Sequence, residues 1–272
     1  MYSALLPVDR DTDRAFHQAT YVARLADGGT PVEATVLYVA PPNRFDRPED
    51  VEFATLEGAA TAADRLEEAG VSVERVVDTG GVPQQIIGTA DERDADEIVM
   101  GGRKRTGVTR VLLGSTVQDV VLSADRPVTV TGGTVTLGTG RRDVLVPVDR
   151  DVDRALAQAR YVANLPNATE HVHATVCYVF PHQDYAGAPP HEFADVDAAV
   201  EAATYLDGEG VAVDRLSLGG EVVSKLLDTA EDLDVDGIVV GGRKRSGVQQ
   251  ILLGSTSLDT TLSAKRPVTI TG

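Results

Sequence analysis

The 272-residue sequence has no tryptophan, two methionines and one cysteine (Cys177), and aromatic residues make up only 4% of it. A single cysteine excludes an intramolecular disulfide framework and any cysteine-rich zinc module. No apolar run approaches the roughly 18 residues that a membrane-spanning helix needs. The N-terminus lacks the basic and apolar regions of a signal peptide. We therefore expect a cytoplasmic protein without membrane insertion.

Lysine is also scarce, because only four of the 25 basic residues are lysines, against 42 acidic residues and a formal charge of -17. This balance argues against nucleic-acid binding, since the phosphate backbone needs a basic face. Such a surface repels itself unless salt screens the charges, and at about 1 M salt the Debye length is only about 3 Å. The composition predicts a halophilic source with a salty cytoplasm. An acidic protein from a mesophile is the alternative.

The chain contains two copies of one unit, offset by 140 residues without gaps. PVDRDTDRA at Pro7 returns at Pro147 with one change, GGRKRTGV at Gly101 returns at Gly241, and LLGST at Leu112 returns at Leu252. We predict a first domain at residues 1–132, a Gly/Thr-rich linker at 133–142 and a second domain at 143–272.

Each copy alternates apolar strand-like runs with helix-like patterns. In the first copy we expect strands at 4–8, 34–39, 71–77, 97–100 and 127–131, and helices that begin near residue 12 and at 53–69, 82–93 and 114–124. Asp11 or Asp13 is the expected N-cap of the first helix, and Gly70 the residue that closes the second. This alternation predicts two α/β domains of the flavodoxin-like or Rossmann-like type, each a five-stranded parallel sheet with helices on both faces.

In such sheets ligands bind beyond the carboxyl ends of the strands. The segment GGRKRTGVTRVLLGST follows the fourth strand and gathers cations and glycines in an otherwise acidic chain. Glycines allow close backbone approach, and Ser115 and Thr116 stand where the next helix begins and offers free N–H groups. These features indicate an anion site, most simply for phosphate. A glycine-rich turn with its arginines paired to carboxylates is the alternative.

Each copy resembles the universal stress protein family, on the strand end PVD, the strand TVLYV, and GGRKRTG followed by GST and RPVTV. The resemblance implies an adenine nucleotide, ATP or AMP, with adenine at Val39, ribose near Asp9 and phosphates over Gly101, Gly114 and Ser115. It also implies that the fifth strands of the two copies meet edge to edge as an intramolecular pseudo-dimer. The candidate binding residues are Pro7, Asp9, Val39, Met100, Gly101, Arg103, Lys104, Gly114, Ser115 and Thr116, and in the second copy Pro147, Asp149, Val179, Val240, Gly241, Arg243, Lys244, Gly254, Ser255 and Thr256.

The family motif of the ATP-binding branch is altered here, because Lys104 and Lys244 replace its middle glycine. Lysine can bind phosphate as a point charge. We therefore expect a regulatory protein that binds an adenine nucleotide, with Asp9 orienting ribose or Mg²⁺. Two alternatives are a nucleotide-free interaction module and a slow ATPase or phosphotransferase. Further association of two chains and the protein partner are left open.

Three other patterns in the sequence are weaker evidence of a functional site. Asp9, Asp11 and Asp13 resemble a calcium loop, but Arg14 replaces the required glycine, so a strand-end and capping role is expected. His171 and His173 are expected on one face of a strand, and they are interpreted with His182 and His191 as surface residues rather than as zinc ligands. Cys177 is expected to be inert packing in a buried strand.

Overall fold

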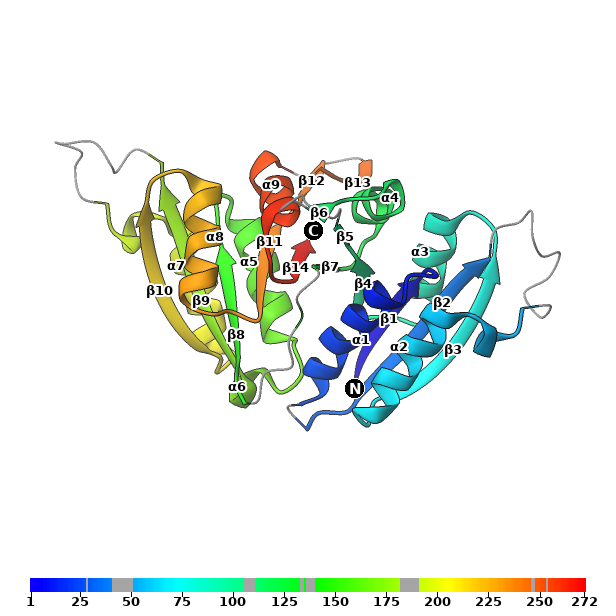
Figure 1. Ribbon diagram of the computed structural model, residues 1–272. Helices are drawn as coiled ribbons and strands as arrows, with labels where there is room; N and C mark the ends of the chain where they lie inside the picture. The colour runs from blue at the N-terminus through cyan, green and yellow to red at the C-terminus, as the bar shows by residue number, and fades with distance from the viewer. Residues whose placement is uncertain are drawn as a thin grey trace.

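The computed structural model describes residues 1–27, 29–40, 51–104, 111–132, 135, 140–181, 191–245, 248–252 and 254–272. Within these residues, ten strands form one continuous sheet in the order β10-β9-β8-β11-β14-β7-β4-β1-β2-β3. Figure 1 shows the two halves of the chain side by side, with β7 and β14 at the middle. Most of the predicted linker at 133–142 lies outside the described residues, and its last residue, Arg142, begins β8.

The chain is an α/β protein in which strands and helices alternate through both halves. The first half contains β1 (Tyr2–Val8), α1 (Thr12–Ala26), β2 (Val32–Ala40), a 3₁₀ turn (Phe53–Thr55), α2 (Glu57–Glu68), β3 (Ser72–Thr79), α3 (Val82–Glu92), β4 (Glu97–Gly101), β5 (Arg103–Lys104), β6 (Val111–Leu112), α4 (Ser115–Ser123) and β7 (Val128–Thr131). The second half contains β8 (Arg142–Pro147), α5 (Val152–Ala163), α6 (Ala168–His171), β9 (Val172–Phe180), a 3₁₀ turn (Phe193–Asp195), α7 (Asp197–Gly208), β10 (Ala212–Gly219), α8 (Val222–Asp232), β11 (Gly237–Gly241), β12 (Arg243–Arg245), β13 (Val248–Leu252), α9 (Ser255–Ser263) and β14 (Val268–Thr271).

Each half is the doubly wound parallel sheet that the alternation predicts. In the first half β1 pairs with β2 and β4, and β4 pairs with β7, all in parallel. Across the sheet the strands of this half therefore follow the order β3-β2-β1-β4-β7, and the direction of the strand order reverses between β1 and β4. β1 and β2 are almost wholly buried because α1 and α2 pack on one face of the sheet and α3 and α4 on the other. The point of reversal is where folds of this kind bind ligands.

Local signals in the sequence explain most helix ends. Asp11 is the N-cap of α1, and its carboxylate accepts from the backbone N–H of Arg14 at 3.0 Å. Gly70 closes α2 with a φ of +76°, which a residue with a side chain adopts only at a cost. The helix expected from Phe53 begins only at Glu57, because the backbone of Leu56, with φ -92° and ψ 89°, is not helical and separates α2 from the preceding 3₁₀ turn.

The two halves join through their fifth strands, as the family resemblance implies. β7 and β14 pair antiparallel, with Thr129 opposite Thr269, so that each covers an edge that would otherwise be exposed. The apolar cluster on each face of the sheet includes residues of both halves. The halves therefore share one core on each face.

The segment after the fourth strand differs from the expected open loop. β5 and β6 form an antiparallel hairpin in the first half, and β12 and β13 form its counterpart in the second. Each hairpin reaches across to the other half, since β6 lies against α9 and β13 lies against α4. A hairpin satisfies the backbone hydrogen bonds of this segment, which an open loop would leave to a ligand or to water.

Candidate functional site

An open cavity of about 430 Å³ lies at the carboxyl ends of β1, β2 and β4 in the first half. Its floor is apolar and is formed by the side chains of Leu37, Val39, Ile86 and Met100. Eight of the ten residues predicted for this half line it: Pro7, Asp9, Val39, Met100, Gly101, Gly114, Ser115 and Thr116. The topology therefore brings these eight together, while their role in binding stays a prediction.

Arg103 and Lys104 are the two predicted residues of this half that are not placed at the cavity. Their backbone forms β5, and their side chains lie outside the described part of the structure, as do those of Arg243 and Lys244. Residues 105–110, which contain the remaining cations of the segment, also lie outside it. The proposed contact of these cations with phosphate stays a prediction.

The N-terminus of α4 forms one wall of the cavity. Gly114 is its N-cap, with φ -66° and ψ 158°, and within the described part of the chain no side chain caps the helix. The first helical hydrogen bond runs from Gln118 to the carbonyl of Gly114, so the preceding N–H groups have no acceptor within the helix. These N–H groups and the positive end of the helix dipole favour a negatively charged group.

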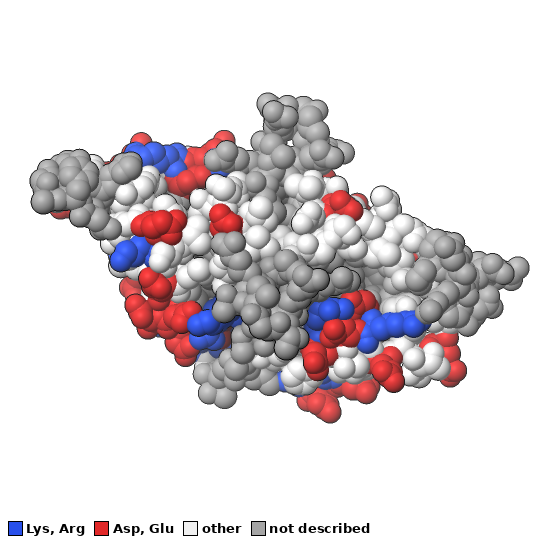
Figure 2. Space-filling model, turned by 45° about the horizontal axis from the view of Figure 1, so that its top comes forward, with Lys and Arg blue, Asp and Glu red and all other residues white. Residues whose placement is uncertain are grey.

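A paired arginine forms the opposite wall. Arg14 of α1 contacts the carboxylate of Asp9 and lies 2.8 Å from that of Asp11. The other oxygen of Asp9 accepts from the backbone N–H of Asp11 at 3.0 Å. Arg14 is therefore held against the wall by two carboxylates, and the cavity beside it is open. On the described part of the face shown in Figure 2, basic side chains form small patches bordered by acidic ones.

Gln18 ties the strand ends together beneath the cavity. Its amide nitrogen donates to the carbonyl of Pro7 at 2.9 Å and to that of Val99 at 2.7 Å. Gln158 makes the same two contacts in the second half, with Pro147 and Val239. Sequence analysis missed Arg14 and Gln18 as site residues. The exact return of both 140 residues later was the signal that could have found them.

Gly101 is required by packing rather than by its backbone angles. A Cβ at this position would lie 3.0 Å from Oε1 of Gln18 and 3.1 Å from Cβ of Arg14. At Gly241 a Cβ would lie 2.5 Å from Cγ of Arg154. The first glycine of the motif therefore lets α1 or α5 approach the end of the fourth strand.

The second half has a corresponding cavity of about 240 Å³. Eight predicted residues line it: Pro147, Asp149, Val179, Val240, Gly241, Gly254, Ser255 and Thr256. Ser257 replaces Val117, and its hydroxyl donates to the carbonyl of Gly241 at 2.9 Å, which ties α9 to the end of β11. Arg154 pairs with Asp149 at 2.7 Å and with Asp151 at 2.6 Å, as Arg14 does in the first half.

The cysteine and histidines contribute little to binding chemistry. Cys177 lines the second cavity but is fully buried, and burial raises the pKa of its thiol to about 12, in agreement with a packing role. His171 ends α6, so the expectation that it shares a strand face with His173 is wrong. His173 is mostly buried between Asp143 and Asp214, so its interpretation as a surface residue is also wrong, because two carboxylates hold its ring. His191 stacks on Phe180, and His182 lies outside the described residues.

The described residues offer neither a metal site nor a membrane-spanning helix. No group of three or more His, Cys, Asp or Glu side chains among them could hold a metal ion by itself. Within the same residues, no helix combines the length and apolar character needed to cross a membrane. The carboxylates of the Asp-rich turn instead cap α1 and pair with Arg14.

The fold and the site define a class: tandem doubly wound α/β proteins with an open crevice at the point of strand reversal in each half. The sequence model of the universal stress protein family matches residues 1–132 and 140–272. The chain therefore belongs to the universal stress protein family.

The chain is also similar to individual proteins, one by sequence and two by structure. Universal stress protein MJ0577 of Methanocaldococcus jannaschii is 31% identical over 65 residues, which are 24% of this chain and 40% of the relative. The match thus spans less than half of that relative. A crystal structure of a universal stress protein from Archaeoglobus fulgidus is similar over 99% of this chain and 97% of its own, with 23% identity and a TM-score of 0.71. A second structure from that organism, in complex with dAMP, covers 47% of this chain and 95% of its own, with 28% identity and a TM-score of 0.36.

Proposed function

We propose that the first-half cavity binds an adenine nucleotide and that the second half offers a smaller version of the same site. The observation that carries this proposal is the uncapped N-terminus of α4 beside an apolar cavity of about 430 Å³. That volume falls within the range of about 300–1,000 Å³ typical of small-molecule sites. A planar base fits the apolar floor, and a phosphate fits the free N–H groups.

The residues divide by chemistry along the cavity. Val39 and Met100 would contact the base, and the backbone of Val39 would offer it hydrogen bonds. Asp9 would accept from the ribose hydroxyls, and Gly114, Ser115 and Thr116 would hold the phosphates. Arg103 and Lys104 would add positive charge from the hairpin. Mg²⁺ would reach the site with the nucleotide, since Mg²⁺ is usually held by substrate phosphates and one or two carboxylates.

The site supports binding rather than rapid turnover. Among the described residues that line the first cavity, Asp9 is the one side chain that could act as a general base. Both oxygens of its carboxylate already accept a hydrogen bond, one from Arg14 and one from the backbone N–H of Asp11, so neither is positioned to take a proton from a substrate. We therefore propose a regulatory protein of the universal stress type that acts in a salty cytoplasm.

Calorimetric titration with ATP and Mg²⁺ in molar KCl tests the proposal. We expect saturable heat at submillimolar ligand, and a loss of affinity of at least about tenfold in Ser115→Asp. An aspartate at this position puts a carboxylate where the phosphate would lie, yet it suits a helix N-terminus, so the fold should be retained.

Gln118→Glu is the control, because it adds the same charge to the same helix at an exposed residue that does not line the cavity, and it removes only the hydrogen bond of 3.3 Å from the Gln118 amide to the carbonyl of Leu113. This variant should bind like the unaltered protein. Absence of heat with the unaltered protein at millimolar ATP and AMP would exclude nucleotide binding. Equal loss in both variants would assign the effect to overall charge and exclude the site at α4.

A further inference from the structure

A buried carboxylate lies at the join of the two halves and has no counterpart in the second copy. Glu97 of β4 is fully buried, whereas the equivalent residue 140 positions later is Gly237. The hydroxyl of Tyr2 donates to Oε2 of Glu97 at 2.7 Å, and that of Tyr21 donates to Oε1 at 3.0 Å. Thr129 of β7 also donates to Oε1. The Glu97 carboxylate thus accepts three hydrogen bonds from hydroxyl groups of its own half.

The second half supplies the next hydroxyls in this network. Thr269 lies 2.6 Å from Thr129, and Tyr161 lies 3.1 Å from Tyr21, each measured between hydroxyl oxygens of equivalent residues. A hydroxyl carries one proton. Because Thr129 and Tyr21 give theirs to Glu97, the protons in these two contacts must come from Thr269 and Tyr161. Donation across the join therefore runs from the second half to the first, and within the second half the hydroxyl of Thr269 also lies 3.4 Å from that of Tyr161.

The second half also supplies the balancing cation. Arg142 occupies the position that Tyr2 has in the first half. It is buried, with only 7% of its surface exposed. It lines a cavity of about 20 Å³ together with Tyr21, Tyr161 and Gly237. The positive charge of Arg142 acts on Glu97 and partly offsets the effect of burial, which raises the pKa of that carboxyl.

Pairing of two like halves would lose both features. Two first halves would place a Glu97 on both sides of the join. Each threonine at the 2.6 Å contact would then donate its single hydroxyl proton to its own Glu97, and neither could donate to the other. Arg142 would also be absent. Two second halves would bury two Arg142 guanidinium groups without the Glu97 carboxylate that each charge would otherwise face, and leave only Asp236 in the cavity beside each. An unpaired buried charge is strongly destabilising.

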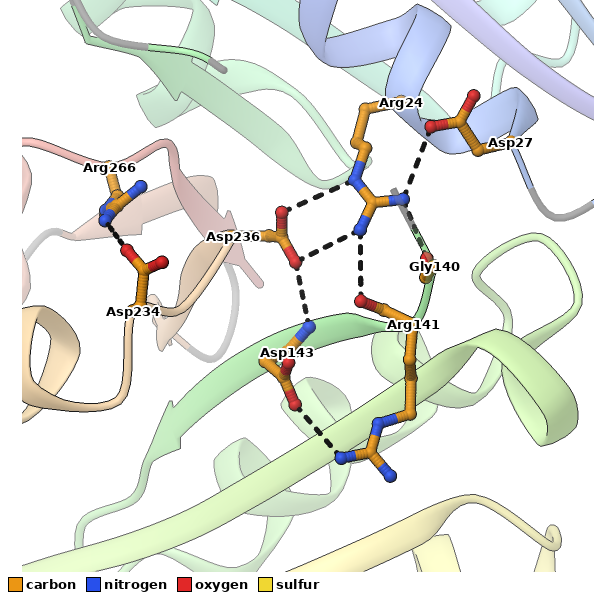
Figure 3. Close-up of polar contacts among 8 residues, drawn as sticks. All are labelled: Arg24, Asp27, Gly140, Arg141, Asp143, Asp234, Asp236 and Arg266. Atoms are coloured by element: carbon orange, nitrogen blue, oxygen red, sulfur yellow. Dashed lines mark hydrogen bonds and ion pairs between the residues drawn. The ribbon is translucent and has the colours of Figure 1, made fainter. Parts of the chain in front are cut away.

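A second asymmetry reinforces the first. Arg24 of α1 reaches into the second half and donates to the carbonyls of Gly140 and Arg141 at 2.9 and 3.1 Å. It also contacts the carboxylate of Asp236 at 3.4 Å (Figure 3). Its counterpart in the second half is Asn164, which is exposed and carries no charge. Two second halves would leave Asp236 without this arginine.

We propose that Glu97 and Arg142 make the joining surface selective, so that each half accepts the unlike half and rejects a second copy of itself. The partner that fits the Glu97 surface of the first half is one with an arginine on its first strand and a glycine on its fourth. The second half meets this description, whether it belongs to the same chain or to another copy of the protein.

Exchange of the two charges within the full chain tests the proposal. Arg142→Tyr with Gly237→Glu makes both halves acidic at the join, and Tyr2→Arg with Glu97→Gly makes both basic. A Cβ at Gly237 would be 3.5 Å from the nearest atom, an ordinary contact, so a Cβ fits there without a shift of the backbone. We expect each double variant to lower the thermal unfolding midpoint by roughly 10 °C. The quadruple variant, with the charges reversed, should recover at least half of that loss.

Refolding the two double variants together provides a second readout. Acidic halves should then pair with basic halves between chains, and light scattering should show complexes of twice the single-chain mass that neither variant forms alone. A quadruple variant no more stable than the doubles would overturn the proposal. So would a co-refolded mixture that contains only species seen with the separate variants.

Discussion

The two cavities keep the same polar residues and differ in their apolar ones. Asp9, Arg14, Gln18 and Ser115 return unchanged 140 residues later. The substitutions between the two linings are Leu37 to Cys177, Ile86 to Leu226, Met100 to Val240 and Val117 to Ser257. The volumes are about 430 and 240 Å³. The shared polar residues in cavities of different size favour the proposal that both halves take one ligand chemistry with different room for the ligand.

The first prediction concerns the turn that carries Asp9 and has the largest expected effect. A Cβ at Gly58 of α2 would lie 2.2 Å from the backbone oxygen of Asp9, whereas the second half has Ala198 at this position. Gly58→Ala must therefore displace backbone, and we expect a loss of about 3 kcal/mol in the free energy of unfolding. Ala198→Gly should cost about 1 kcal/mol, the usual price of glycine in a helix.

Denaturant unfolding in molar KCl measures both changes. If Gly58→Ala costs no more than Ala198→Gly, the halves have the same backbone path at this turn, and the difference between the cavities must arise elsewhere. Nucleotide affinity of the first half should fall with Gly58→Ala, since Asp9 lines its cavity.

How far the sequence predicts the molecule depends on whether a feature is local. Asp11 as a cap and Gly70 as a helix end follow from neighbouring residues, and the structure confirms both. The repeat and the alternation predict the sheet, and the strand order then brings Pro7, Val39 and Gly114 to one cavity. The binding role of these residues stays a prediction.

Features that depend on contacts between distant segments were not predictable in this way. The hairpin of β5 and β6 is stabilised against α9 of the other half, and nothing within GGRKRTGVTRVLLGST indicates that partner. Glu97 reads as the polar start of a strand, and only the pairing of β7 with β14 reveals that it is buried. His173 was misjudged for the same reason, because Asp143 and Asp214 come from neighbouring strands.

The second prediction compares Arg24 with Asn164 and has an intermediate effect. Only 6% of the Arg24 surface is exposed, and Arg24→Ala would remove its hydrogen bonds to two backbone carbonyls and would leave Asp236 with the backbone N–H of Asp143 as its donor (Figure 3). We expect a loss of about 2 kcal/mol. Asn164→Ala should change stability by less than about 0.5 kcal/mol, because the side chain is exposed.

Thermal unfolding of the two alanine variants in low and high KCl makes this comparison. The cost of Arg24→Ala should persist in high salt, since the contacts are buried and salt screens buried pairs weakly. A cost that disappears in molar KCl would show that Arg24 acts as a surface charge and does not clamp the two halves.

The third prediction uses Glu97, which the second half lacks, and has the smallest expected effect. Burial raises the pKa of Glu97 above its ordinary value of 4.5, and the hydroxyl donors and Arg142 oppose this change. A raised pKa means that the folded state holds the proton more tightly than the unfolded state. The proton therefore stabilises the fold fully below the ordinary pKa, and this stabilisation is lost as the pH rises through the folded-state value.

Glu97→Gln isolates this contribution, because glutamine keeps the shape and an acceptor but does not titrate. The unfolding free energy of the unaltered protein minus that of Glu97→Gln should fall as the pH rises above 4.5 and level off once Glu97 is ionised in the folded state. Denaturant unfolding of both proteins at a series of pH values in constant molar KCl measures the difference, and the other carboxylates cancel. A difference that instead grows with pH would mean that the three hydroxyls and Arg142 outweigh burial. The join would then favour a charged Glu97 despite its burial, and the asymmetry between the halves would be chiefly electrostatic.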